Sequence, residues 1–206
     1  MLRALAFFAL TAASYAATIV SVSGPIDFTG AIGSSQAMTV GFTTGQAYNS
    51  VTISALISGL AGQTVDAYLT TSIGAGTTVA DEVASGVINL PGFNPGVLTP
   101  VFAGLNLAPG SYYLTLFNPD NNSGGWSSTE TPTVFDVPGS SYDFSGYFIT
   151  NAVPLPYPPG ATFVDLSTQD GRTLIFSVDT VSVPEPGTWL VGVGLALLAL
   201  GRWRRR

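Results

Sequence analysis

The stretch NLAPGSYYLTLF, residues 106–117, shows most clearly which kind of fold this chain adopts. Its first part ends on Pro109 and Gly110, a pair that favours a tight turn, because proline fixes its own φ angle and glycine accepts φ angles that other residues avoid. Its second part, residues 112–117, is rich in aromatic and apolar side chains that alternate around Thr115, as in a half-buried strand. A turn that leads directly into such a strand predicts antiparallel β-structure.

The same pattern recurs along the chain. Further short alternating runs occupy residues 38–43, 51–57, 65–71, 142–149 and 173–178. The chain contains 24 glycines and 14 prolines, which separate these runs, and no long segment of the body shows apolar residues at helical spacing with caps. We therefore expect one domain over residues 17–182, an all-β, antiparallel, jelly-roll-like β-sandwich of roughly eight to ten strands.

Basic residues gather at the two ends of the chain. Of the six arginines only Arg172 lies between residues 17 and 183, and the chain has no lysine. The same segment holds eleven of the twelve acidic residues, so it carries a formal charge of −10. Nucleic acids bind basic proteins through their phosphates, and an acidic body is therefore not expected to have a nucleic-acid partner.

Residues 1–16 resemble a secretory signal peptide in composition. Arg3 precedes an apolar stretch of about ten residues, and small side chains follow at Ser14 and Ala16. This order predicts passage through the secretion translocon and cleavage by signal peptidase between Ala16 and Ala17. About ten apolar residues are too few to span a bilayer. The alternative, an amphipathic first helix of a globular domain, needs a polar face that the stretch lacks.

Residues 183–206 end the chain with an apolar run and a cluster of arginines. The uncharged residues 188–201 would form a helix of about 21 Å, which is short for a hydrocarbon core of about 30 Å unless Trp189 and Trp203 lie at its interfaces. The cluster consists of Arg202, Arg204, Arg205 and Arg206. It predicts a transmembrane helix with its C-terminal end in the cytoplasm, holding the protein transiently at the inner membrane. The alternative, a buried helix of the domain, conflicts with four arginines.

This end of the chain resembles the PEP-CTERM sorting signal. The resemblance rests on the order of a short motif, an apolar helix and the arginine cluster; the motif residues are Val183, Pro184, Glu185 and Pro186. The resemblance implies that a membrane-embedded exosortase recognises the motif and cleaves nearby. It also implies a Gram-negative bacterium that makes exopolysaccharide, and a final location at the cell surface or in the extracellular matrix. Such tails are also catalogued as ice-binding protein C-terminal domains, a label that adds ice binding as an alternative.

The body carries a second resemblance. Residues 107–130, LAPGSYYLTLFNPDNNSGGWSSTE, are similar to a segment of exported β-sandwich proteins that have tails of this kind. The shared order is a Pro-Gly turn, an aromatic-rich strand, a polar loop and a tryptophan. The similarity implies a related fold and no particular activity.

The residue types of the body argue against catalysis. It contains no histidine, cysteine or lysine, so a serine nucleophile would have no base beside it and zinc or copper would lack its preferred ligands. A carboxylate pair of the kind glycosidases use is conceivable as Asp120 with Glu130 or as Asp165 with Asp170. Carboxylates are, however, mostly solvated surface groups. We expect neither an enzyme nor a cofactor.

Calcium is the one ion that the sequence suggests, as a structural site. Asp120 and Asn122 are the candidate ligands, because carboxylate and carbonyl oxygens bind calcium and Gly125 follows them as in a calcium loop. The twelfth position is Thr131 instead of glutamate, which excludes the helical calcium loop but not a site in a sandwich loop. The alternative is that aspartate, asparagine and glycine stand here because turns favour them.

Trp126 is the only tryptophan of the body. An exposed aromatic ring can stack on a sugar, so Trp126 and Tyr112 are candidate glycan-binding residues, with Tyr113, Tyr142 and Tyr147 as further aromatic residues. The alternative is that Trp126 covers an edge or an end of the sandwich.

These observations predict an exported, acidic β-sandwich with a structural or adhesive role in the envelope or the exopolysaccharide matrix. The first alternative is a carbohydrate-binding module that uses Trp126 and neighbouring tyrosines. The second is an ice-binding protein, which needs a flat array of regularly spaced threonines. The pairs Thr70-Thr71 and Thr77-Thr78 do not continue into such a period.

Overall fold

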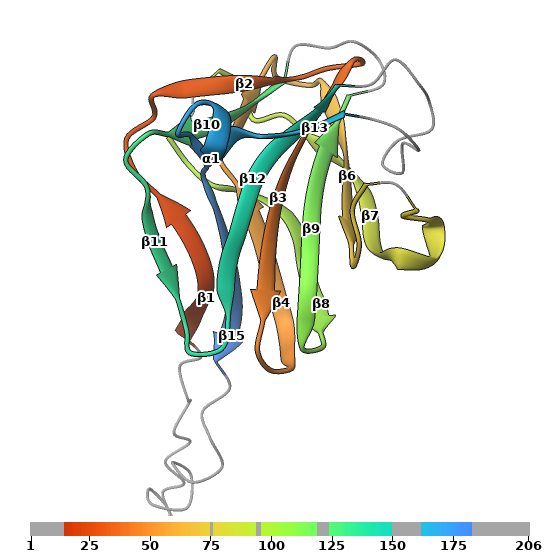
Figure 1. Cartoon of the computed structure of the whole chain (residues 1–206), viewed down its shortest axis with the longest axis vertical. Coiled ribbons are helices and arrows are strands. Elements are labelled where there is room, and N and C mark those ends of the chain that lie inside the picture. The colour runs from red at the N-terminus through yellow and green to blue at the C-terminus, as the bar shows by residue number, and fades with distance from the viewer. Residues whose placement is uncertain (1–14, 75, 94–95, 119–123, 150–161, 183–206) are drawn as a thin grey trace, which may run out of the picture. The chain divides into compact units, whose positions relative to one another are not determined.

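The computed structural model describes residues 15–74, 76–93, 96–118, 124–149 and 162–182, and these residues are almost entirely β-structure (Figure 1). The strands are β1 (Tyr15–Ser23), β2 (Phe28–Ile32), β3 (Gln36–Thr44), β4 (Tyr48–Ala55), β5 (Ile57–Gly59), β6 (Thr64–Thr70), β7 (Glu82–Asn89), β8 (Thr99–Leu107), β9 (Gly110–Phe117), β10 (Gly124–Thr129), β11 (Thr133–Asp136), β12 (Ser141–Ile149), β13 (Thr162–Asp165), β14 (Thr173–Leu174) and β15 (Phe176–Ser182). The helical elements of these ranges are a 3-10 turn, η1 (Val79–Asp81), and a single turn of helix, α1 (Leu166–Gln169).

Eight of these strands pair in the nested order of a jelly roll. In chain order they are β1, β3, β4, β6, β7, β8, β9 and β15. The first lies beside the last, the second pairs with the seventh (β3 with β9), the third with the sixth (β4 with β8) and the fourth with the fifth (β6 with β7). A long hairpin folded over on itself produces this pairing, which is that of a double-sheet jelly roll. The expected antiparallel, jelly-roll-like sandwich is confirmed, although the described residues form fifteen strands instead of the roughly eight to ten expected.

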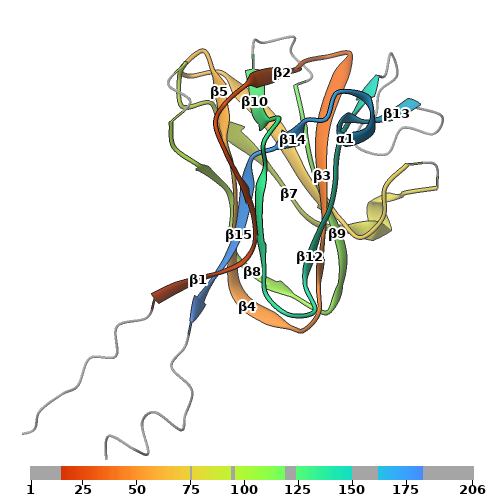
Figure 2. The ribbon, with the colours of Figure 1, turned by 60° about the vertical axis from the view of Figure 1, so that its left-hand side comes forward.

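The jelly roll forms two large sheets. The β15 sheet has the strand order β11-β1-β15-β4-β8, and the β3 sheet has the order β13-β12-β3-β9-β6-β7. Figure 2 shows them as two layers, with β15 and β8 in one and β3 and β12 in the other. The segment between β9 and β15 extends both layers, because β11 pairs with β1 and β12 pairs with β3.

A small sheet of β14, β10, β2 and β5 lies at one end of the sandwich (Figure 1). Three backbone hydrogen bonds form its corner with the β15 sheet: the N–H of Leu56 donates to Ile175 (3.1 Å), that of Ser127 to Leu56 (2.9 Å), and that of Ile175 to Ser127 (3.0 Å). Leu56 separates β4 from β5, and Ile175 separates β14 from β15. The alternating runs 51–57 and 173–178 therefore each divide into two strands that belong to different sheets.

Apolar side chains from both large sheets fill the space between them. Phe42 of β3 and Phe176 of β15 are fully buried, and their ring centroids lie 6.2 Å apart across the core. Tyr142 of β12 approaches the same Phe176 ring at 6.1 Å. Burying a side chain of this size contributes about 1.5–3 kcal/mol. Because the chain has no cysteine, the stability of the sandwich depends on this core.

Residues Thr18–Thr180 form one compact unit. The signal peptide predicted over residues 1–16 lies outside the described residues except at its last two positions, and the helix predicted after residue 183 lies wholly outside them. Among the described residues, no helix has the length and apolar character that a membrane crossing requires.

Candidate functional site

Trp126 and Tyr112 are buried, which corrects their interpretation as glycan-binding residues. Trp126 is 0% exposed, and its indole Nε1 donates to the carbonyl oxygen of Ile175 at 2.9 Å. Tyr112 is 4% exposed, and its hydroxyl donates to the carbonyl oxygen of Ala108 at 2.8 Å. A ring must present a free face to stack on a sugar, and neither ring does. Trp126 belongs to β10 and fills the end of the sandwich, as the alternative interpretation supposed.

Most other predicted site residues lie outside the described residues. These are the calcium candidates, the sorting motif and the arginine cluster: Asp120, Asn122, Val183, Pro184, Glu185, Pro186, Arg202, Arg204, Arg205 and Arg206. In the part of the chain that is described, no three side chains of the acidic, histidine or cysteine type are grouped so that they could hold a metal ion.

The predicted signal-peptide cut falls inside β1. Ala16 and Ala17 are both exposed residues of this strand, which starts at Tyr15. Cleavage between them would leave residues 17–23, and the residues that pair with β11 are Val20, Ser21, Val22 and Ser23. The predicted cut therefore leaves the pairing of β1 with β11 intact.

The threonine pairs considered for ice binding do not form an exposed array. Thr70 and Thr77 are buried, and the hydroxyl of Thr70 donates to the carbonyl oxygen of Ser72 at 2.7 Å. Thr78 is exposed, but its hydroxyl oxygen caps η1 by accepting from the N–H of Ala80 at 3.3 Å. Local hydrogen bonding thus accounts for these threonines.

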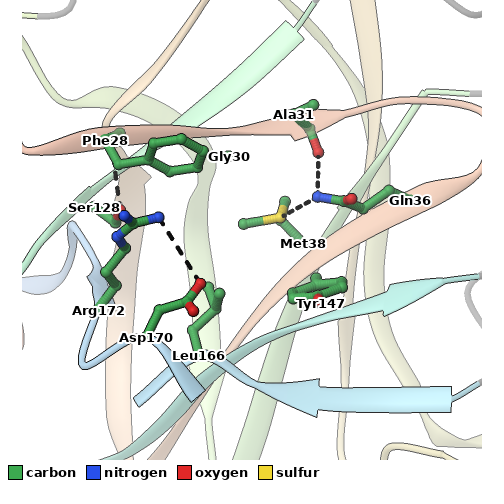
Figure 3. Close-up of a pocket in the computed structure, with 10 residues that line it drawn as sticks. All are labelled: Phe28, Gly30, Ala31, Gln36, Met38, Ser128, Tyr147, Leu166, Asp170 and Arg172. Carbon is green, nitrogen blue, oxygen red and sulfur yellow. Dashed lines mark hydrogen bonds and ion pairs between the residues drawn. The ribbon is translucent and has the colours of Figure 1, made fainter. Parts of the chain in front are cut away.

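A pocket of about 270 Å³ lies near the end of the sandwich and is the candidate site (Figure 3). Its lining comes from β2 (Phe28, Gly30, Ala31), β3 (Gln36, Met38), β10 (Ser128), β12 (Tyr147), and α1 with the turn after it (Leu166, Asp170, Arg172). These segments are far apart in the sequence, so only the folded chain creates the pocket. Its volume is close to the lower limit of the ~300–1,000 Å³ common for small-molecule sites.

Aromatic rings reach the pocket from two sheets. Phe28 of the small sheet is 47% exposed, and Tyr147 of the β3 sheet is half-buried. Figure 3 shows Met38 between them. Met38 occupies the space beside Gly30, where a Cβ atom would lie 2.5 Å from the methionine Cε. The amide Nε2 of Gln36 donates to a backbone carbonyl of β2 at 2.9 Å and lies 3.3 Å from the sulfur of Met38. The apolar floor of the pocket is therefore fixed in place.

The turn after α1 brings the charged side chains to the pocket. Gly171 has a φ angle of +67°, a left-handed conformation that glycine adopts without strain. The N–H groups of Asp170 and Arg172 both donate to the carbonyl oxygen of Leu166, at 2.9 and 3.3 Å. The chain thus folds back on the first residue of α1, and both charged side chains line the pocket.

Arg172 is the only basic residue among the described residues. Its Nε donates to Glu130 Oε1 at 3.3 Å, and its Nη1 lies 3.8 Å from Asp170 Oδ2. Its guanidinium carbon lies 4.3 Å from the centroid of the Phe28 ring, where the π-electrons of the ring attract a cation. Two carboxylates and one ring therefore hold Arg172 in position at the pocket wall.

Three carboxylates lie in the neighbourhood of Arg172, although only Asp170 lines the pocket with it. Asp27 lies near the same corner, because its Oδ2 accepts from the N–H of Glu130 at 2.8 Å and from the hydroxyl of Thr129 at 3.4 Å. Asp27, Glu130 and Asp170 thus outnumber Arg172. A site surrounded by one sign of charge raises the local concentration of ligands of the other sign and repels ligands of its own. The arrangement offers aromatic surface and polar groups to a ligand that is not an anion.

Sequence reasoning did not identify the pocket, although it named two of its residues. Tyr147 was among the aromatic candidates, and Arg172 stands out in the sequence as the single positive charge of an acidic body. The position of Arg172 as a single cation among many carboxylates was the one feature of the sequence that could have pointed to the pocket, because such a cation tends to pair with carboxylates. Nothing in the sequence near Phe28 distinguishes it from other apolar residues.

The last residues of the chain match a known family. Residues 182–206 match the PEP-CTERM protein-sorting motif, which confirms the resemblance seen in the sequence. The motif marks an exported protein that an exosortase processes at the membrane. The match includes only the last residue of β15 from the sandwich. Neither the curated proteins nor the solved structures contain a match to this chain.

Proposed function

We propose that this protein is a structural or adhesive component of the cell envelope or the exopolysaccharide matrix, and that it reaches this place after an exosortase has processed its C-terminal end. Signal peptidase, the secretion translocon and the inner membrane are its partners during export, and exopolysaccharide is its partner afterwards. The proposed role is binding and not catalysis.

The main support for this proposal is the position at which the sorting motif begins. The match starts at Ser182, which is also the last residue of β15. β15 lies between β1 and β4 in the middle of its sheet. Cleavage near Pro184, Glu185 or Pro186 would therefore remove no strand of the jelly roll. The product would be a complete domain without the C-terminal apolar segment, as a surface or matrix protein requires.

The pocket supports adhesion to glycans as the second, more specific part of the proposal. Phe28 and Tyr147 offer aromatic surface, and Arg172 and Asp170 offer hydrogen-bond donors and acceptors beside it. Sites for small polar ligands commonly combine apolar walls with a few convergent polar groups in this way. The candidate carbohydrate site thus moves from Trp126, which is buried, to this pocket.

Two measurements on native cells test the proposal. The first is the mass of the mature protein with both termini identified, which should place its start at Ala17 and its end close to Pro186. A protein that ends at Arg206 and stays in the membrane fraction would contradict processing. The second compares the parent strain with a strain that makes no exopolysaccharide. The protein should be retained in the matrix fraction of the parent and lost to the medium in the other strain; equal loss in both would contradict adhesion.

A further inference from the structure

We infer that the pocket binds a neutral sugar unit of a polysaccharide, packed against Phe28 and hydrogen-bonded to Arg172 and Asp170. This inference rests on the proposed adhesion to the matrix and names the chemical class of the ligand. It excludes uronate units as the preferred ligand, although the pocket contains the only basic side chain among the described residues.

The dimensions of the pocket suit one sugar unit. Its volume is about 270 Å³, and exposed residues stand at its rim, since Phe28 is 47% exposed and Asp170 is also exposed. The pocket is therefore accessible from solvent, and a unit at the end of a glycan chain can enter it while the rest of the chain stays outside.

The chemistry of the walls matches that of a pyranose. A pyranose presents C–H groups on its faces, which pack on an aromatic ring, and hydroxyl groups around its edge, which both donate and accept. The guanidinium group has five N–H donors, and the hydrogen bond to Glu130 uses one of them. The carboxylate of Asp170 accepts. Adjacent donors and acceptors of this kind can hold neighbouring hydroxyl groups of one sugar.

The ion pairs prepare the site for binding. Arg172 contacts Glu130 and Asp170 and lies over the Phe28 ring at 4.3 Å. These contacts order the ring and the guanidinium group before a ligand arrives, so binding loses less side-chain freedom.

The charges around Arg172 decide between neutral and anionic sugars. A uronate carboxylate that bonded to the remaining donors of Arg172 would lie close to the carboxylates of Glu130 and Asp170, with Asp27 also nearby. Like charges at such short range oppose each other. A neutral sugar avoids this repulsion and uses the same donors and acceptors.

Isothermal titration calorimetry on the full chain tests the inference. The chain is held in an amine-oxide detergent, because detergents with sugar head groups would compete for the pocket. Three classes of tetrasaccharide are titrated: the neutral cellotetraose and laminaritetraose, the anionic tetragalacturonate, and the cationic tetramer of glucosamine. At least one neutral tetramer should bind, and it should bind on the order of tenfold more tightly than tetragalacturonate. Tighter binding of tetragalacturonate or of the glucosamine tetramer, or no binding of either neutral tetramer, would overturn the inference.

A matched pair of variants locates the binding. Phe28→Ala removes the aromatic wall, whereas Phe135→Ala removes a ring of similar exposure, 49%, from β11 outside the pocket. Neutral binding should weaken on the order of tenfold in Phe28→Ala and stay unchanged in Phe135→Ala. Equal effects of the two changes would overturn the assignment to the pocket.

A third variant gives a gain instead of a loss, which a misfolded protein cannot imitate. Asp170→Asn removes one negative charge but keeps hydrogen-bonding atoms, so the affinity for tetragalacturonate should rise several-fold, on the order expected for one nearby charge. An unchanged or lower affinity would contradict the electrostatic argument. Failure of these titrations, with retention in the matrix fraction of native cells intact, would reject the ligand class and leave the proposed function standing.

Discussion

Replacing Ser145 by alanine should uncouple the β3 sheet from the small sheet at the end of the sandwich. Ser145 lies in β12 and is fully buried. Its Oγ accepts two hydrogen bonds, one from the N–H of Leu174 in β14 at 2.9 Å and one from the hydroxyl of Tyr142 at 3.0 Å. Alanine fits the same space, so the change removes the acceptor and almost nothing else.

The two donors lose different amounts of free energy. The N–H of Leu174 is buried, and leaving it without an acceptor costs about 1–3 kcal/mol. Tyr142 is half-buried, and burial raises the pKa of its phenol. Its hydroxyl also lies near the Thr173 side chain and can turn toward it, so its loss is only the net value of a hydrogen bond, about 0.5–1.5 kcal/mol. Together the two terms lower the free energy of unfolding by about 3 kcal/mol.

Urea unfolding followed by circular dichroism, on the full chain in detergent, measures this effect in a double-mutant cycle. Tyr142→Phe removes one of the two donors, so the double variant leaves only the N–H of Leu174 unpaired. It should be more stable than the sum of the single changes predicts, by about 1 kcal/mol. Ser111→Ala is the control, because its hydroxyl pairs with Thr43 on an exposed surface, and it should change stability by less than about 0.5 kcal/mol. A Ser145→Ala variant as stable as this control, or strictly additive changes, would refute the reasoning.

Three further predictions follow from burial, close contacts and titration. With the two tryptophans of the tail replaced by phenylalanine, the fluorescence of Trp126 should be blue-shifted and resist quenching by iodide; strong quenching would show that Trp126 is exposed. Gly45→Ala should lower the free energy of unfolding by about 2 kcal/mol, because the new Cβ would lie 2.6 and 2.8 Å from backbone atoms of a neighbouring turn; Gly33→Ala meets no atom within 4 Å and should be neutral, and equal effects would contradict this. Finally, burial raises the pKa of Tyr142 above its ordinary 10.0, so the folded state holds the phenolic proton more tightly than the unfolded state. This stabilisation is complete below about pH 10 and falls as the pH rises further, so urea midpoints should decline above pH 10 in the unaltered chain, and less steeply in Tyr142→Phe; identical profiles would refute it.

Alternation of apolar and polar residues identified β3, β4, β6, β9, β12 and β15. In these strands the inward face is buried, and turn residues mark their ends. Alternation did not identify β1, β2, β7, β8, β10, β11 or β13. β7 shows the physical reason. Val83 and Val87 of β7 are exposed, whereas the inward positions include Ala84 and Gly86. Small residues suffice there because Phe102 of the other sheet fills the space, with its ring 3.8 Å from where a Cβ of residue 86 would be. The large side chain that packs against the inner face of β7 thus belongs to another strand, so the sequence of β7 itself does not show the apolar alternation.

The pocket could not be predicted for a related reason. Its two aromatic residues come from β2 and β12, and its charged pair comes from the turn after α1. No local sequence pattern connects these segments. They are brought together only by strand pairing in the small sheet and in the β3 sheet. The aromatic residues that the sequence does make conspicuous, Trp126 and Tyr112, are conspicuous because they are large, and large apolar rings gain most from burial. A conspicuous aromatic residue in this sequence is therefore better evidence for the core than for a binding site.

The strand order also shows which cleavage positions would leave the domain intact. β15 is the last strand in the sequence, yet it lies in the middle of its sheet between β1 and β4. It is joined to the start of the domain by the hydrogen bond from Thr18 Oγ1 to Asp179 Oδ1, 2.7 Å long and spanning 161 positions. Contacts of such sequence separation are slow to form, and here they need the final strand. A cut before Phe176 would remove a central strand together with its buried side chains, whereas a cut beyond Ser182 removes none. Processing that leaves the jelly roll intact would therefore have to take place after β15, in the segment that the sorting motif occupies.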